Sequence, residues 1–123
     1  MEVVIGSRQD YFSYEQNAEG KYDIMITPPY EKNEKCRTGF FFDSIKLMNE
    51  YILRVSQTDS EGNKKFGLIV GNGWFKIYHP CKFDKIKPYK GVLVQAFIGD
   101  EEYLIDHYGN VYSREFYDMR NQQ

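Results

Sequence analysis

Phe42-Asp43-Ser44-Ile45-Lys46 is a short stretch that returns 41 positions later as Phe83-Asp84-Lys85-Ile86-Lys87. Each copy is followed by an apolar segment, at 51–55 and at 91–95, and then by a Leu-Ile segment and a turn rich in glycine. A repeat of this length is one small unit that buries its apolar face by stacking on a neighbour. The sequence therefore predicts a chain assembled from stacked copies of one unit.

Apolar and polar residues alternate along much of the chain, for example at 21–27, 50–57 and 91–98. A period of two places alternate side chains on one side of a strand, so each run predicts a strand with one apolar face. Residues that tolerate positive φ separate the runs and predict hairpin turns at 18–20, 60–63, 71–73, 98–100 and 108–110. The predicted fold is all-β, an antiparallel hairpin meander with little helix, although 42–54 also fits a short amphipathic helix.

The order of parts resembles the WG-type β repeat, whose units run Y-D-x-I, an alternating strand, W/F-G-L-I-D, a turn ending in Gly, and V-I-P-P. Lys65-Phe66-Gly67-Leu68-Ile69 matches the central segment, and Trp74 to Phe83 matches the connection into the next unit. Ile24 to Tyr30, with Pro28-Pro29-Tyr30, resembles part of an earlier, degenerate copy. Glu102-Tyr103 replaces the aromatic-glycine pair in the last copy, and Val70 replaces the aspartate in the copy before it. The resemblance implies a string of antiparallel hairpins without known catalytic residues.

The chain of 123 residues is expected to form one domain, because 41% of its residues are hydrophobic and 17% are aromatic. The expected units are a degenerate one at about 1–39, a second at about 40–80 and a third at about 81–119, with a frayed tail at 120–123. So few units leave exposed sheet edges. The expected covers are Val3-Val4-Ile5, the insertion at 31–39 and Phe116-Tyr117, or else a second copy in a homodimer.

The charge balance is mildly acidic, with a net charge of −2. This argues against nucleic acid as a general partner, which would require a basic excess. The lysines at 82–90 are interpreted as charged residues on a strand edge that discourage pairing with a strand of another chain. The N-terminal segment lacks the basic and apolar regions of a signal peptide, and no apolar run approaches the ~20 residues of a membrane span. A cytoplasmic protein that does not associate with membranes is therefore expected.

The residues able to carry chemistry are few. Cys36, Cys81, His79 and His107 lack the close spacing of a zinc site, so no metal, no cofactor and two reduced thiols are expected. Asp106-His107 is interpreted as part of a hairpin turn and not as a catalytic pair, because an aspartate side chain in a turn commonly forms a hydrogen bond to the backbone two residues later. Pro80 argues against a strand that would align His79 with Cys81 as base and nucleophile. No catalytic residues are predicted.

Aromatic residues are the distinctive feature of the second half of the chain. Because Tyr and Trp are enriched at binding hot spots, Trp74, Tyr78 and Tyr89 are the predicted binding residues. The leading hypothesis is a non-catalytic intracellular module that binds another protein, such as a small inhibitor, immunity or anti-defence protein that covers its partner's working surface. The alternative is a protein that binds an aromatic or nucleotide-like small ligand where two units or two subunits meet. A small enzyme is the third hypothesis.

Overall fold

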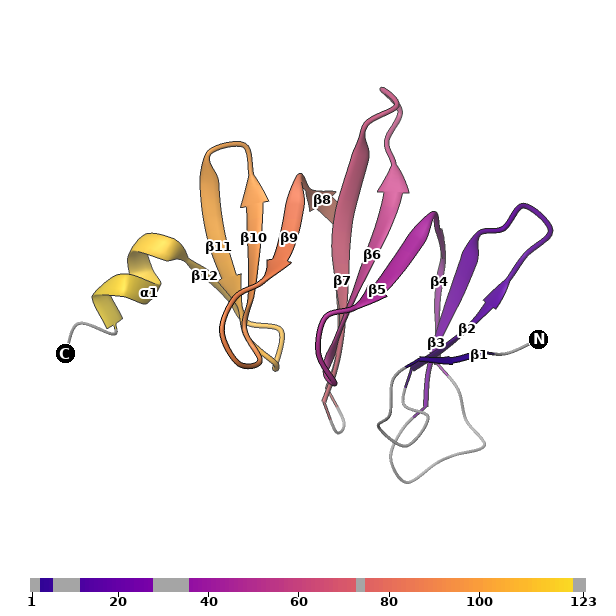
Figure 1. Ribbon diagram of the computed structural model, residues 1–123, viewed down its shortest axis with the longest axis horizontal. Coiled ribbons are helices and arrows are strands. Elements are labelled where there is room, and N and C mark those ends of the chain that lie inside the picture. Colours follow the sequence, from indigo (N-terminus) through magenta and orange to yellow (C-terminus); the bar gives the residue numbers. More distant parts are fainter. Residues whose placement is uncertain (1–2, 6–11, 28–35, 73–74, 121–123) are drawn as a thin grey trace.

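The computed structural model describes residues 3–5, 12–27, 36–72 and 75–120, and its strands form three antiparallel sheets arranged in a row (Figure 1). Each sheet contains four consecutive strands of the chain. The prediction of an all-β meander with little helix is confirmed. The described part of the chain contains no helix with the length and apolar character that crossing a bilayer requires.

The first sheet comprises β1 (Val3–Ile5), β2 (Phe12–Gln16), β3 (Tyr22–Ile26) and β4 (Cys36–Phe42). The second comprises β5 (Ser44–Leu47), β6 (Ile52–Thr58), β7 (Lys64–Asn72) and β8 (Phe75–Phe83). The third comprises β9 (Lys85–Pro88), β10 (Val94–Ile98), β11 (Glu101–Ile105) and β12 (Val111–Ser113), and the helix α1 (Arg114–Arg120) follows it.

The repeated Phe-Asp pair joins one sheet to the next. Phe42 and Phe83 end β4 and β8, and both are buried. The following residue, Asp43 or Asp84, donates its backbone N–H to the second strand of the next sheet, over 2.8 Å and 2.7 Å respectively. Its carboxylate forms an ion pair with Lys21 or Lys65 of the preceding sheet. The repeat therefore marks the two places where the chain passes between sheets.

Two apolar cores hold the sheets together, one between the first and second sheets and one between the second and third. On β6, Leu53 and Val55 pack in the first core, whereas Ile52 packs in the second. The second sheet is thus buried on both faces. The sequence predicted a single apolar face for this strand, and the difference arises because the middle layer of a stack contacts a neighbour on each side.

Three hairpin turns of five residues have the same hydrogen bonds. They begin at Asn17, Asp59 and Asp106, whose side-chain Oδ1 accepts the backbone N–H groups two and four residues later. The fourth residue of each turn is a glycine with positive φ. The turns predicted at 18–20, 60–63 and 108–110 are confirmed. Gly71 and Asn72 end β7, and Gly73 lies outside the described residues.

Residues 44–54 form β5, a turn and the start of β6, so the strand prediction holds here and the alternative of a short amphipathic helix is wrong; their apolar side chains are needed on both sides of the middle sheet. One segment differs from its expected conformation. Met119 and Arg120 belong to α1, which packs beside β11 and β12, and Arg120 is therefore not part of a tail. The remaining tail residues, 121–123, lie outside the described residues.

Candidate functional site

A bulge interrupts β4, the last strand of the first sheet. Arg37 pairs with Met25 and Phe41 pairs with Asp23, so β4 uses two more residues than β3 to cover the same distance. Within this bulge, the Phe40 N–H donates to Thr38 Oγ1 over 3.2 Å, and the Thr38 hydroxyl donates to the Phe40 carbonyl over 3.3 Å. Bulges redirect side chains and terminate strand pairing at sheet edges. Here the Thr38 side chain forms hydrogen bonds with both the backbone N–H and the backbone carbonyl of Phe40.

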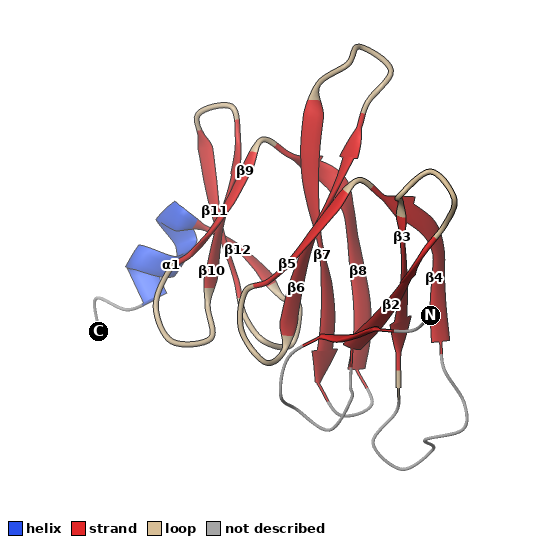
Figure 2. Ribbon diagram, turned by 45° about the vertical axis from the view of Figure 1, so that its right-hand side comes forward, coloured by secondary structure: helices blue, strands red, loops and turns tan. Residues whose placement is uncertain are grey.

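The bulge places two phenylalanines where solvent reaches them. Phe40 is 48% exposed and Phe41 is 51% exposed. The Phe40 ring lies beside the half-buried Tyr78 of β8, with 5.2 Å between centroids, and Tyr78 also contacts the buried Phe42 at 5.9 Å. Phe40 and the adjacent Phe41, together with Tyr78 beside the Phe40 ring, are called the aromatic patch below. The patch spans the boundary between the first two sheets, where β4 and β8 are the last strands (Figure 2).

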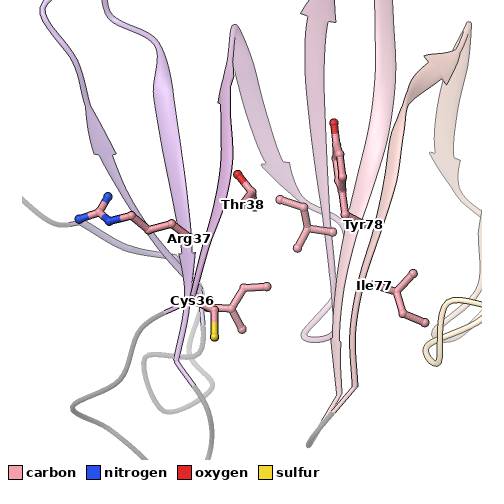
Figure 3. A pocket seen from close by; sticks show the side chains of 7 residues that line it. Cys36, Arg37, Thr38, Ile77 and Tyr78 are labelled. Atoms are coloured by element: carbon pink, nitrogen blue, oxygen red, sulfur yellow. The ribbon is translucent and has the colours of Figure 1, made fainter.

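A cavity of about 130 Å³ lies between β4 and β8. Cys36 and Thr38 line it from β4, Tyr78 lines it from β8, and the Arg37 guanidinium extends away from it (Figure 3). Arg37 instead forms ion pairs with Asp23 and Glu15. The cavity also contacts Ile26, Ile69 and Ile77. Its lining is therefore mainly apolar, and its volume is well below the roughly 300–1,000 Å³ of a pocket for a drug-sized ligand.

Burial controls the ionisation of two groups beside this cavity. It raises the pKa of Tyr78 to about 12 and the pKa of Cys81 to about 11. The Cys81 thiol also lies 3.9 Å from the Val55 carbonyl oxygen. Both side chains are neutral at pH 7, as they would also be at their ordinary pKa values.

The three predicted binding residues do not form one site. Tyr78 belongs to the aromatic patch. Tyr89 follows β9, is half-buried, and contacts Tyr117 of α1 at 6.4 Å between centroids and the Arg114 guanidinium at 5.3 Å. Trp74 lies outside the described residues. Tyr78 and Tyr89 therefore belong to different surfaces.

Sequence reasoning did not select Phe40 and Phe41. It treated 40–42 as a short apolar stretch, although a period of two cannot bury three consecutive phenylalanines on one face. The available signal was Gly39, because a lone glycine inside a strand pattern often indicates a bulge.

The candidate chemical pairs are separated or engaged elsewhere. Cys81 packs against the first core, whereas the His79 ring Nε2 lies 2.8 Å from the Gly109 carbonyl oxygen in a turn of the third sheet. The Asp106 carboxylate accepts backbone N–H groups of its own turn, as the sequence predicted. Among the residues that the structure describes, no three His, Cys, Asp or Glu side chains form a group that could hold a metal ion.

Comparison of the chain with protein-family models, curated proteins and solved structures found no match. The resemblance to the WG-type repeat therefore stays a prediction.

Proposed function

We propose that this chain is a non-catalytic intracellular protein-binding module and that its partner binds the aromatic patch. The observation that carries the proposal is the exposure of Phe40 and Phe41 on a bulged edge strand. Single exposed apolar residues are common on protein surfaces, but two exposed aromatics that are adjacent in the chain, one of them beside a third ring, are the kind of feature that marks an interaction site. An inhibitor, immunity or anti-defence protein that covers a partner's working surface would use such a patch.

The surroundings of the patch support protein binding in two ways. First, the two phenylalanines are large rigid side chains that lose little conformational entropy on binding and desolvate a large apolar area. Second, the three side chains of the patch are uncharged, so they bring no charge that would have to be desolvated on binding. Charge depletion at the centre is typical of protein interfaces.

A small-ligand-binding protein is the second candidate, and the cavity between β4 and β8 favours it. The cavity lies where two units meet. An apolar cavity of about 150 Å³ can bind benzene, so a volume of about 130 Å³ suits one small ring and not a nucleotide. If this candidate is correct, the ligand is a small apolar molecule.

The test is co-purification from the native host with matched variants. The wild-type protein, the double variant Phe40→Ser/Phe41→Ser and the control Tyr108→Ser are used as baits under identical conditions. Tyr108 is an exposed aromatic in a turn of the third sheet and lies outside the patch. We expect a stoichiometric partner with the wild type and the control, and at least a roughly thirtyfold loss of affinity in the double variant, equivalent to a hot-spot contribution of about 2 kcal/mol.

Each alternative outcome has a defined meaning. If the folded double variant retains the partner, the binding site lies elsewhere than the aromatic patch. Recovery of an ultraviolet-absorbing small molecule, with no protein partner, would favour the second candidate. Turnover of that molecule by the purified protein would favour the enzyme hypothesis.

A further inference from the structure

The outer face of the third sheet is incompletely covered. This face is turned away from the second sheet, and α1 lies beside it against β11 and β12 (Figure 1). Leu104 is fully buried, but Phe97 of β10 is only half-buried. The helix itself presents Phe116 and Met119, which are 53% and 63% exposed. Apolar surface therefore remains on both the sheet and the helix.

One edge of this sheet is basic. Lys85 and Lys87 are exposed on β9, and the Lys87 ammonium lies 5.2 Å from the centre of the Phe97 ring. Within the described part of the chain, no carboxylate lies within ion-pair distance of either ammonium group. Within the described residues, Lys85 and Lys87 therefore form no ion pair, and Lys87 interacts electrostatically with Glu102 only beyond ion-pair distance.

An acidic region lies on the other side of the same sheet, between the β10–β11 turn and the start of α1. Asp100, Glu101 and Glu115 are exposed and line a surface hollow of about 540 Å³ between β11 and the start of α1. Arg114 also lines the hollow, but it is engaged by Glu102 and Asp118. None of the other described basic residues forms an ion pair with these three carboxylates. The two sides of the third sheet thus carry opposite charges that form no ion pairs among the described residues.

We propose that two copies of the chain pair through this end of the molecule, so that Lys85 and Lys87 of each copy face the acidic hollow of the other. A two-fold axis brings the same surface of both copies together, so one rotation matches both charged sides at once. An acidic partner would complement Lys85 and Lys87 but face Asp100, Glu101 and Glu115 with like charge, and a basic partner would have the converse defect. Phe97, Phe116 and Met119 supply apolar area between the charged contacts. This pairing is independent of the aromatic patch.

The test measures self-association by sedimentation equilibrium at concentrations up to several hundred micromolar. The variants are Lys85→Glu/Lys87→Glu, Glu101→Lys/Glu115→Lys and the control Lys46→Glu/Lys64→Glu, which reverses two exposed lysines of the second sheet. We expect the wild type and the control to form dimers that weaken as salt is added. Either reversal at the third sheet should weaken the dimer at least about tenfold, because like charges then face each other.

An equimolar mixture of the two third-sheet variants provides the decisive measurement. In that pair every reversed charge faces its opposite, so heterodimers should form although neither variant dimerises alone. A wild-type protein that stays monomeric would overturn the proposal, as would failure of the mixture to associate while both variants are folded by circular dichroism. A dimer that resists both reversals but is lost in Phe40→Ser/Phe41→Ser would assign self-association to the aromatic patch and likewise overturn it.

Discussion

Gly62 and Gly109 occupy the same position in two turns that share their hydrogen bonds, with φ of +85° and +88°. Their surroundings differ. A Cβ at Gly62 would meet nothing within 4 Å, whereas a Cβ at Gly109 would lie 2.8 Å from Ile77 Cδ1 and 3.2 Å from Ile77 Cβ. Replacing each glycine with alanine therefore separates the cost of backbone conformation from the cost of packing between the second and third sheets.

The expected magnitudes follow from these contacts. Both alanines must adopt a left-handed conformation, which costs about 1–2 kcal/mol of unfolding free energy. Gly109→Ala must also displace Ile77, which packs against the core between the second and third sheets. Overpacking of this kind costs about 1–3 kcal/mol more. Gly109→Ala should therefore destabilise the protein by at least about 1 kcal/mol more than Gly62→Ala.

Urea unfolding followed by far-ultraviolet circular dichroism measures both losses. The substitution Ile77→Val removes the Cδ1 atom, so it should recover part of the loss in a Gly109→Ala background and none in a Gly62→Ala background. Equal losses at the two glycines, or no recovery with Ile77→Val, would refute the packing of this turn against β8. Gly62 is the matched control because it holds the same turn position as Gly109 and has nearly the same φ.

Three further predictions concern ionisable groups. A hydrogen bond from Lys65 holds the pKa of Asp84 below its ordinary value, so the ionised Asp84 stabilises the folded state. This contribution to the free energy of unfolding is present above about pH 4 and is lost as pH falls further. Lys65→Met should therefore reduce the loss of stability that urea unfolding measures on acidification. Cys36 is exposed, whereas burial raises the pKa of Cys81 to about 11, so a disulfide reagent at pH 7 should label Cys36 rapidly and Cys81 only on unfolding. Burial of Asp106 is outweighed by its hydrogen bonds, which lower its pKa. Asp106→Asn keeps the two bonds that Oδ1 accepts but loses the two that Oδ2 accepts from Asn110 and Tyr112, whereas Asp106→Ala loses all four; in urea unfolding the alanine variant should cost about 1–3 kcal/mol and the asparagine variant less.

The fold was largely predictable because its signals are local. Alternation with a period of two identified the strands, and the Asn, Asp and Gly positions identified the turns. The repeated Phe-Asp pair identified the repeating units, and the structure shows that it marks the passage from one sheet to the next. Burial of β6 on both faces was less apparent, although consecutive apolar residues such as Ile52 and Leu53 are typical of a strand that is covered on both sides.

The candidate site was only partly predictable. Tyr78 was selected because aromatic residues are enriched at interfaces, and it does lie in the aromatic patch. The exposure of Phe40 and Phe41 depends on the two extra residues of the β4 bulge, and periodicity does not report how many residues a bulge contains. The separation of Tyr78 from Tyr89 likewise depends on tertiary structure, because it follows from the stacking of whole sheets.

The third sheet differs from the first two in the charged residue that follows its last strand. Asp43 and Asp84 follow the last strands of the first and second sheets and form ion pairs with lysines, whereas Arg114 follows β12 and forms its ion pair with Glu102. The backbone N–H groups of both aspartates bond to the next sheet, but after β12 the Ser113 hydroxyl instead accepts the Phe116 N–H over 3.2 Å, which caps a helix. A helix thus replaces the strand that would begin another sheet. This helix reaches Tyr89 after β9 but leaves Lys85 and Lys87 of β9 exposed, so the same local change that interrupts the repeat also leaves open the surface proposed for a second copy.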